Sequence, residues 1–515
     1  MTNTAENNKR IAKNTMFLYF RMAIMMGIAL YTSRIVLDTL GEVDYGLYNV
    51  VGGVVTMFTV INFAMGCATS RFITFEIGKQ DIKRLNTVFS TSIIIHFIIA
   101  LIILILSETI GLWFLNTQMT IPTERMVAAN WVFQFSVFSC MIMIISVPYN
   151  ALIMSYEKMS AYAYITILET VLKLIIVYLL VISNIDKLIL YSILMFVISL
   201  IIRITYQIYC TRKFKEIRFK LKTDKYILKE MFLYAFWSLT GSAANILATH
   251  GQNILLNIFF GPSVNAARGV AVQVQNAIQQ FSTNFQQAMN PQINKSYAQG
   301  NLEYMHTLIN ASSKYSFYLL FIISLPVFLE IKMVLSWWLV ETPEHTINFI
   351  RLMLIICILT ALGNPLSVAA GAHGKIRNFQ LFVGGFMLLV VPISYCVLKI
   401  FPKPEYIFIA QIIVCILAQI IRLIIIKPMI NFSLIHYFKE VIYTCTKVTI
   451  ISSVLPVIVH YTLQESIYSF FLVCTLSLFS STITIYLIGL NNNEKSFVQN
   501  RIKKLINNVS STNLE

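Results

Sequence analysis

Long apolar stretches separated by short polar segments make up most of the chain. A helix needs about 20 mostly apolar residues to cross the hydrocarbon core of a bilayer, and about 14 stretches reach this length. The pattern therefore predicts an all-α polytopic membrane protein. We expect its membrane-spanning helices at 14–37, 46–69, 87–108, 127–151, 161–182, 188–210, 233–258, 265–288, 309–330, 347–370, 378–400, 405–426, 441–463 and 466–489.

The same order of apolar and polar positions occurs twice. The segment 40–87, a short loop followed by a mostly apolar span and a polar loop, corresponds without a gap to 260–307. The aligned positions include Gly41 and Gly261, Pro148 and Pro365, and Lys158 and Lys375. An internal duplication in such an apolar chain is typical of transporters, whose substrate path lies between the two halves.

The duplication predicts two lobes of six spans each. We expect an N-lobe at 1–210 and a C-lobe at 231–430, joined by a basic cytoplasmic linker at 211–230. Two further spans follow at 431–490 and a cytoplasmic tail at 491–515. The basic residues of the linker either hold anionic lipid headgroups or only set the topology.

Composition and charge agree with this class. Hydrophobic residues make up 57% of the 515 residues and charged residues only 12%, whereas about 25% charged residues is usual for soluble proteins. About 25 of the 39 lysines and arginines lie in alternate loops, which the positive-inside rule places in the cytoplasm together with both termini. The net charge of +16 thus reflects topology, and no nucleic acid partner is expected.

The chain shows no motif for catalysis or metal binding. The eight cysteines lie in or beside apolar spans and never in Cys-x-x-Cys spacing, so neither disulfides nor a zinc site are expected. The seven histidines are scattered, and no nucleophile or phosphate-loop motif is present. We therefore expect no catalytic residues, no metal and no cofactor.

Two neighbouring spans are unusually polar. Eight side-chain amides lie between positions 273 and 287, and they cannot all face lipid, because each unsatisfied polar group there is costly. Hydrogen bonds between helices, worth about 0.6 kcal/mol each, are one explanation. A water-filled cavity is the other, and amides would suit the hydroxyl and acetamido groups of sugars there. The candidate substrate-binding residues are Asn245, Gln273, Asn276, Gln280 and Asn284.

Arginines supply the candidate charges. Arg21 lies inside the first span with no acidic residue three or four positions away, and an arginine at the membrane centre costs about 2.5–3.5 kcal/mol. It therefore faces a partner or water. Arg34 and Arg268 lie near span ends. Guanidinium groups bind phosphate through paired hydrogen bonds, although salt bridges between lobes or exposure at helix ends also explain each arginine. Glu169 and Lys173, four residues apart, are expected to pair.

Several short segments resemble a known family. They are Ser33-Arg34-Ile35-Val36-Leu37, the turn from Leu40-Gly41 to Tyr45-Gly46-Leu47-Tyr48, its counterpart Phe260-Gly261-Pro262, and Gly371-Ala372-His373-Gly374-Lys375. Together with the pattern of spans they resemble the polysaccharide transporter family, the O-antigen and capsule-repeat flippases. That family belongs to the multidrug/oligosaccharidyl-lipid/polysaccharide exporter superfamily, and the resemblance covers nearly the whole chain.

The resemblance implies two six-helix lobes in a V and alternating access. The implied cargo is an oligosaccharide on undecaprenyl diphosphate, moved from the inner to the outer leaflet of the bacterial inner membrane for surface polysaccharide or O-antigen assembly. Basic cavity residues of the family are matched here by Arg21, Arg34 and Arg268. The implied partners are this lipid-linked substrate, membrane lipids and other polysaccharide-assembly proteins.

Three other functions would require different features in the sequence. A multidrug cation-coupled exporter of the same superfamily would hold an acidic residue deep in the N-lobe, where the chain has only Glu169 beside Lys173. A glycan polymerase or ligase would carry a large outer loop with catalytic arginines or histidines, and no such loop is predicted. A membrane scaffold would not explain the polar spans. We therefore expect a transporter and not an enzyme.

Overall fold

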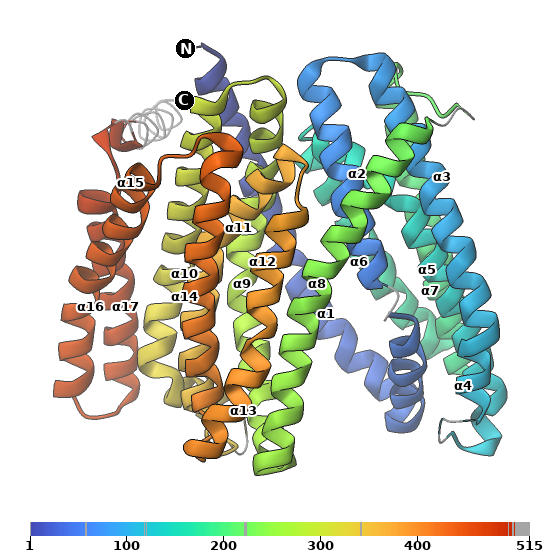
Figure 1. Cartoon of the computed structure of the whole chain (residues 1–515). Coiled ribbons are helices and arrows are strands. Elements are labelled where there is room, and N and C mark those ends of the chain that lie inside the picture. Colours follow the sequence, from blue (N-terminus) through green and yellow to red (C-terminus); the bar gives the residue numbers. More distant parts are fainter. Residues whose placement is uncertain are drawn as a thin grey trace, which may run out of the picture. The chain divides into compact units, whose positions relative to one another are not determined.

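The computed structural model shows helices joined by short connections (Figure 1). It describes residues 2–56, 59–117, 119, 121–220, 224–339, 342–492, 494–496 and 499, without several side chains of the first two helices, among them Arg34. The helices are α1 Thr2–Thr56, α2 Thr59–Lys79, α3 Ile82–Leu106, α4 Leu112–Thr117, α5 Met126–Ser155, α6 Met159–Ile182, α7 Lys187–Lys213, α8 Lys225–Phe260, α9 Pro262–Ala298, α10 Leu302–Trp338, α11 Thr346–His373, α12 Arg377–Leu388, α13 Val390–Ile400, α14 Tyr406–Ile430, α15 Leu434–Tyr437, α16 Thr444–Thr462 and α17 Ile467–Thr484. Turns of π-helix at Ser107–Gly111, Phe438–Tyr443 and Ile485–Gly489 continue α3, α15 and α17.

The predicted all-α membrane fold is confirmed. In the described part of the chain, 11 helical stretches are long and apolar enough to cross a membrane, and each coincides with a predicted span. The three remaining predicted spans fall on α1, α2 and α9, which are not among those stretches. The total of 14 spans therefore stays a prediction, and α9 is the helix that carries the run of amides.

The backbone supports the internal repeat. Eight described residues have a positive φ angle, which residues other than glycine rarely adopt. Six of the eight occupy corresponding positions of the two repeats. The pairs are Gly41 (77°) and Gly261 (82°), Gln80 (60°) and Gly300 (74°), and Glu157 (57°) and Gly374 (92°). The same connections between helices therefore have the same geometry in both repeats, and at Gly41 the expected loop is a sharp break within α1.

Contacts between helices divide the chain into two compact units. Unit 1 comprises Met1–Ile246, Gln287–Met305 and Val368–Gly385, and unit 2 comprises the remainder, Leu247–Gln286, His306–Ser367 and Phe386–Glu515. Unit 1 thus holds the whole first repeat together with short segments of α8 to α12. The expected lobe boundaries stay a prediction.

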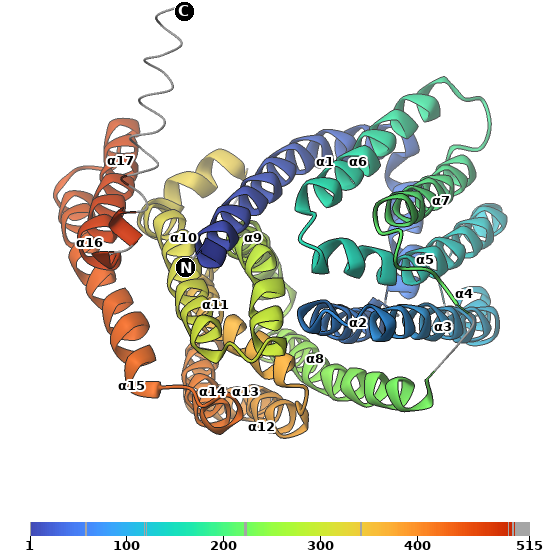
Figure 2. The same ribbon diagram turned by 90° about the horizontal axis from the view of Figure 1, so that it is seen from above.

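Each unit has its own apolar core. In unit 1, α5 packs against α2, α3 and α7 (Figure 2), and Ile73, Val88 and Leu152 are buried between them. In unit 2, Phe349 of α11 contacts Phe408 of α14 with ring centroids 4.7 Å apart. The final helices α16 and α17 pack against each other as a pair (Figure 1).

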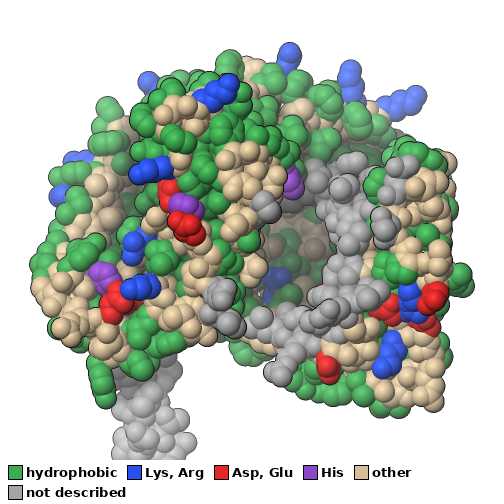
Figure 3. Space-filling view, turned by 90° about the horizontal axis from the view of Figure 1, so that it is seen from below, with side chains coloured by type: hydrophobic (Ala, Val, Ile, Leu, Met, Phe, Trp, Pro, Cys, Tyr) green, Lys and Arg blue, Asp and Glu red, His purple; other side chains and the backbone are tan. Residues whose placement is uncertain are grey.

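Hydrogen-bonded acidic side chains lie at the end of the helices predicted to be outside. In unit 1, Arg125 directly precedes α5 and binds both Asp44 and Asp186, with Nη1 2.6 Å from Asp186 Oδ2. In unit 2, His345 directly precedes α11, and its Nδ1 lies 2.7 Å from Glu405 Oε1. Figure 3 shows acidic and basic side chains next to each other at this end of the molecule.

The two carboxylates of these pairs have lowered pKa values. Burial opposes the ionisation of Asp186, but hydrogen bonds from Arg125 and the backbone outweigh it and hold the pKa below its usual range. For Glu405, burial is likewise outweighed by hydrogen bonds from His345 and Asn348, and its pKa is lowered too. Both carboxylates are therefore charged at neutral pH.

Candidate functional site

A polar cavity of about 800 Å³ lies inside unit 1. It is enclosed by α1, α2, α5, α6 and α7, all from the first repeat. Serines and asparagines supply much of its lining, with Tyr162 and Tyr206 as its aromatic walls. Membrane helices tolerate such groups where they line an aqueous cavity rather than face lipid.

Glu169 and Lys173 of α6 both line this cavity. Lys173 Nζ lies 2.6 Å from Glu169 Oε1. The predicted pair between them is therefore confirmed. Because both residues belong to α6, the charge of Glu169 is cancelled by a lysine of the same helix.

Arg21 of α1 lies at the border of the same cavity. Its guanidinium carbon is 4.6 Å from the centre of the Tyr162 ring, and its Nε contacts Met25 Sδ at 3.2 Å. Its charge also acts on the nearby Tyr206, and none of these three described side chains is a carboxylate. The salt bridge considered as an alternative for Arg21 is thus not found in the described part, and a role in substrate binding stays a prediction.

The other two candidate arginines differ from Arg21. Arg34 belongs to α1, but its side chain lies outside the described residues. Arg268 of α9 is only 8% exposed, and its Nη2 donates to the carbonyl of Thr249 in α8 at 3.2 Å. Its Nε is buried without a hydrogen-bond partner. Arg268 therefore links two helices of unit 2, and a further role in binding stays a prediction.

The candidate amides of α9 share one face of the helix but differ in burial. Gln273, Asn276 and Gln280 are exposed and lie on one face of the helix. Asn284, four residues after Gln280, lies on the same face but is only 4% exposed. Asn245 of α8 is exposed and donates to the carbonyl of Gly241 in its own helix at 2.9 Å.

The buried face of α9 shows that part of the amide run joins helices. Gln286 donates to Ser316 Oγ at 3.0 Å and to the carbonyl of Ala361 at 3.2 Å, and it accepts from Asn364 at 3.2 Å. The explanation by hydrogen bonds between helices is therefore confirmed for Gln286, and the water-filled cavity stays a prediction for the exposed face. Only the exposed face remains available to a substrate.

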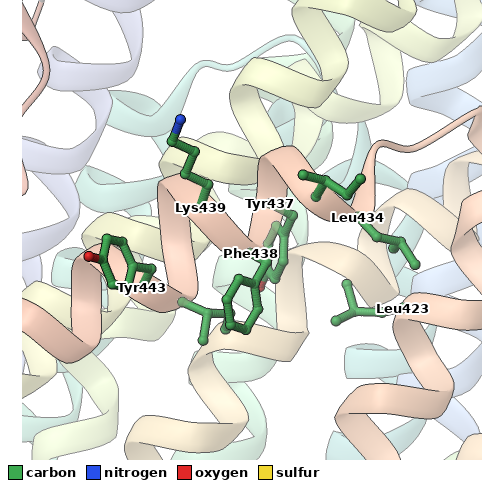
Figure 4. A pocket seen from close by; sticks show the side chains of 8 residues that line it. Leu423, Leu434, Tyr437, Phe438, Lys439 and Tyr443 are labelled. Carbon is green, nitrogen blue, oxygen red and sulfur yellow. The ribbon is translucent and has the colours of Figure 1, made fainter.

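A second cavity of about 600 Å³ lies in unit 2 beside α14 and α15 (Figure 4). Leu423, Leu434, Tyr437 and Phe438 surround it, and the ammonium group of Lys439 points away from them. Its lining is almost wholly apolar. It therefore offers no partners to a polar ligand.

A buried carboxylate at the predicted cytoplasmic end of unit 1 was not predicted from the sequence. The side chain of Glu157, in the turn between α5 and α6, is fully buried. It accepts from Arg10 Nε at 2.7 Å, from Gln292 Nε2 at 2.7 Å and from Lys295 Nζ at 2.5 Å. Burial lowers the pKa of Lys295, against the effect of the nearby carboxylate. In the sequence, only the position of an acidic residue beside Lys158 pointed to this buried carboxylate.

The corresponding turn of the second repeat also binds a cation, at Gly374. Arg71 of α2 lies over the rings of Phe72 and Phe75, at 4.5 and 4.8 Å. Its Nη2 donates to the carbonyl of Ala372 at 3.3 Å. A Cβ atom on Gly374 would lie 2.5 Å from the same nitrogen, so the guanidinium would have to move.

The described residues contain no group of three or more His, Cys, Asp or Glu side chains able to hold a metal ion. All eight cysteines are free. The duplicated helices and the polar intramembrane cavity define the class of the protein, a multi-pass transporter.

Solved structures support this class. The chain resembles an outward-facing multidrug resistance MATE family transporter of the MOP superfamily, with a TM-score of 0.72 and 14% identity over 82% of this chain and 96% of that one. It also resembles a MOP superfamily transporter from Pyrococcus furiosus, with a TM-score of 0.69 and 17% identity over 82% and 96%. At these identities the likeness shows the fold. No curated protein sequence matches the chain significantly.

The family is shown by sequence. The profile of the family described as "Polysaccharide biosynthesis protein" matches residues 11–296, more than half of the chain. The chain therefore belongs to this family, and the resemblance to polysaccharide transporters of the MOP superfamily is confirmed.

Proposed function

We propose that the protein is a flippase for an oligosaccharide linked to undecaprenyl diphosphate. It moves this substrate by alternating access from the inner to the outer leaflet of the bacterial inner membrane, with both termini in the cytoplasm. The product serves surface polysaccharide or O-antigen assembly, and other assembly proteins receive it. Membership of the polysaccharide biosynthesis family supports a glycan cargo.

The exposed amide face of α9 is the observation that carries the proposal. Gln273, Asn276 and Gln280 are exposed, while Gln286 on the opposite face is buried. An exposed amide in contact with lipid loses its hydrogen bonds, so this face lies against water or substrate. Amides both donate and accept, as sugar hydroxyl and acetamido groups require.

Arg21 supports a diphosphate on the same substrate. Its described contacts are an aromatic ring and a sulfur atom, which leave its positive charge uncompensated. Such a charge inside a membrane span costs about 2.5–3.5 kcal/mol, and a bound phosphate would offset this cost.

A multidrug exporter remains the second candidate, because the fold is shared with one. The Glu169–Lys173 pair argues against a multidrug exporter, because the carboxylate that would attract an organic cation is already paired with a lysine. Uptake of cationic dyes into inverted vesicles separates the two functions. Dye export that depends on Glu169 would favour the drug exporter.

The two faces of α9 provide a matched test of the glycan proposal. Replacing Gln273, Asn276 and Gln280 together by Leu is expected to leave membrane levels unchanged and to abolish export of surface glycan. The control, Gln286→Leu, breaks buried hydrogen bonds and is expected to lower protein levels instead. Normal export by the triple variant would contradict the proposal.

Arg21 provides the second test. Arg21→Ala is expected to lower affinity for the lipid diphosphate roughly ten- to hundredfold, because a hydrogen bond to a charged group contributes about 1.5–3 kcal/mol. Arg21→Lys keeps the charge but not the planar pair of donors, and it should fall between Ala and wild type. Equal affinity in all three proteins, measured with purified transporter, would remove Arg21 from the mechanism.

A further inference from the structure

Arg422 of α14 lies within a predicted membrane span and pairs with no described carboxylate. It precedes Ile430, the last residue of the helix, by about 12 Å at a rise of about 1.5 Å per residue. The ionisable groups that act on its charge are the thiol of Cys415 and the hydroxyl of Tyr437, and neither is charged at neutral pH. A positive charge inside a membrane span is costly without a counterion. The charge of Arg422 is therefore balanced by something other than a described carboxylate.

Two buried N–H donors at this place lack a hydrogen-bond partner. Arg422 Nη1 donates to Gln419 Oε1 at 2.7 Å. Because a guanidinium group only donates, the amide oxygen has to face it, and the NH2 group of Gln419 is turned away from it. Arg422 Nε and Gln419 Nε2 are both buried without a hydrogen-bond partner. Native proteins rarely leave buried donors unsatisfied, so the two nitrogens indicate a bound water or ion.

The guanidinium of Arg422 is held in place by α11. A Cβ atom on Gly363 would lie 1.8 Å from Arg422 Nη1, so the guanidinium fills the space beside this glycine. Tyr437 lies next to Arg422 and Gln419, and its hydroxyl donates to the carbonyl of Leu362 at 3.1 Å. Because the proton of Tyr437 is already used, the donors offered to a ligand are those of Arg422 and Gln419.

A small anion matches this arrangement better than a water molecule does. Water would accept from the two donors but would leave the charge of the guanidinium uncompensated, and the attraction between opposite charges is strong where the dielectric constant is low. Chloride accepts from several N–H groups and carries one negative charge for one guanidinium. A phosphate group carries nearly two charges at neutral pH and would require further donors.

We infer that Arg422 and Gln419 bind a chloride ion beside Gly363, between α11 and α14 of unit 2. The ion neutralises the arginine and thereby stabilises the packing of the two helices. This site is independent of the glycan cargo. The stability of the transporter accordingly depends on the kind of anion in the solution.

Thermal unfolding of the purified full-length protein tests the inference. Wild type is compared in sodium chloride, sodium bromide and sodium gluconate at one ionic strength of about 0.15 M. Chloride and bromide are expected to raise the melting temperature by about 2–4 °C over the much larger gluconate, in a saturable manner, because an ion that binds only the folded state stabilises it. Equal melting temperatures in the three salts would overturn the inference.

Two variants assign the effect to this site. Gln419→Glu supplies a tethered negative charge in place of the ion, since the side-chain oxygen at this position already lies 2.7 Å from Arg422 Nη1. It should be as stable in gluconate as wild type is in chloride, and it should no longer respond to chloride. Arg422→Gln removes the cation and should abolish the response to chloride as well.

Arg351→Gln is the matched control. Arg351 of α11 also lies in a span of unit 2, but its Nε donates to the carbonyl of Phe328 at 3.0 Å. This variant should keep the full response to chloride. A response that persists in Arg422→Gln or in Gln419→Glu would show that the ion binds elsewhere, and the inference would be wrong.

Bromide locates the ion without any variant, which covers the case in which the variants fail to fold. In crystals of the wild-type protein grown in bromide, anomalous X-ray scattering should give a peak within about 3.5 Å of Arg422 Nε, a hydrogen-bonding distance. A water molecule at this place without an anomalous signal would refute the inference.

Discussion

The two repeats make the same turn with different chemistry. Glu157 and Gly374 occupy equivalent positions, both with a positive φ, and each turn receives a cation from the equivalent helix of the other repeat. Lys295 of α9 reaches Glu157 as an ion pair. Arg71 of α2 reaches the Gly374 turn through a backbone carbonyl and aromatic rings. One contact depends on charge and the other on shape.

This difference shows which property a duplication conserves. The backbone geometry is kept because it determines how the helices connect, while the side chains that fill the turn have diverged. Both contacts lie within unit 1 at the predicted cytoplasmic end. Separating the repeats at this end requires both contacts to break.

The largest loss of stability is expected from removing the charge of Glu157. Glu157→Gln leaves Lys295 and Arg10 without their carboxylate, and breaking a buried ion pair from one side costs about 3–5 kcal/mol. We expect a much lower melting temperature and less protein in the membrane. Adding Lys295→Met should recover most of the loss, since no buried charge remains there.

The exposed Glu124→Gln is the matched control and should change stability by less than about 0.5 kcal/mol. An unchanged melting temperature for Glu157→Gln, or no recovery in the double variant, would show that the ion pair does not hold the turn.

A smaller loss of stability is expected from Gly374→Ala. A left-handed backbone costs an ordinary residue about 1–2 kcal/mol, and the new Cβ displaces the guanidinium of Arg71. In contrast, Gly385→Ala, where no atom lies within 4 Å of the added Cβ, should be neutral or stabilising. Equal melting temperatures for the two variants, measured by thermal unfolding, would refute a role of shape at this turn.

The smallest loss of stability is expected at the predicted outer ends of the helices. There, the contact between Arg125 and Asp186 in the first repeat corresponds to the contact between His345 and Glu405 in the second. Because the folded-state pKa of Asp186 lies below its unfolded value, its contribution to stability is complete at neutral pH and is lost only as the pH falls through the folded pKa. Arg125→His makes this pair depend on a protonated imidazole. We expect a loss of at most about 1 kcal/mol at pH 8 relative to pH 6.

Wild type provides the comparison for Arg125→His, since its guanidinium stays charged throughout this range. Thermal unfolding at the two pH values measures the difference between the proteins. A variant with the same pH profile as wild type would show that the pair is too exposed to matter.

Local features were predictable from the sequence. Apolar length alone predicted the 11 spans that the structure supports, and the four-residue spacing of Glu169 and Lys173 predicted their pairing, because both depend only on helix geometry. Glycines at equivalent positions predicted the breaks at Gly41 and Gly261. The pairing of Glu157 with Lys295 was not predictable, because it joins residues far apart in the chain.

The amides of α9 show which features the sequence determines and which depend on the tertiary structure. Their number in an otherwise apolar span already required hydrogen-bond partners, since the membrane interior supplies none. Only the packing of α10 and α11 decided that Gln286 is buried against Ser316 and Ala361 while Gln280 stays exposed. The sequence by itself determined the spans, the duplication and the need for a polar environment. The tertiary structure decided which polar groups are satisfied internally, because that depends on which helices become neighbours.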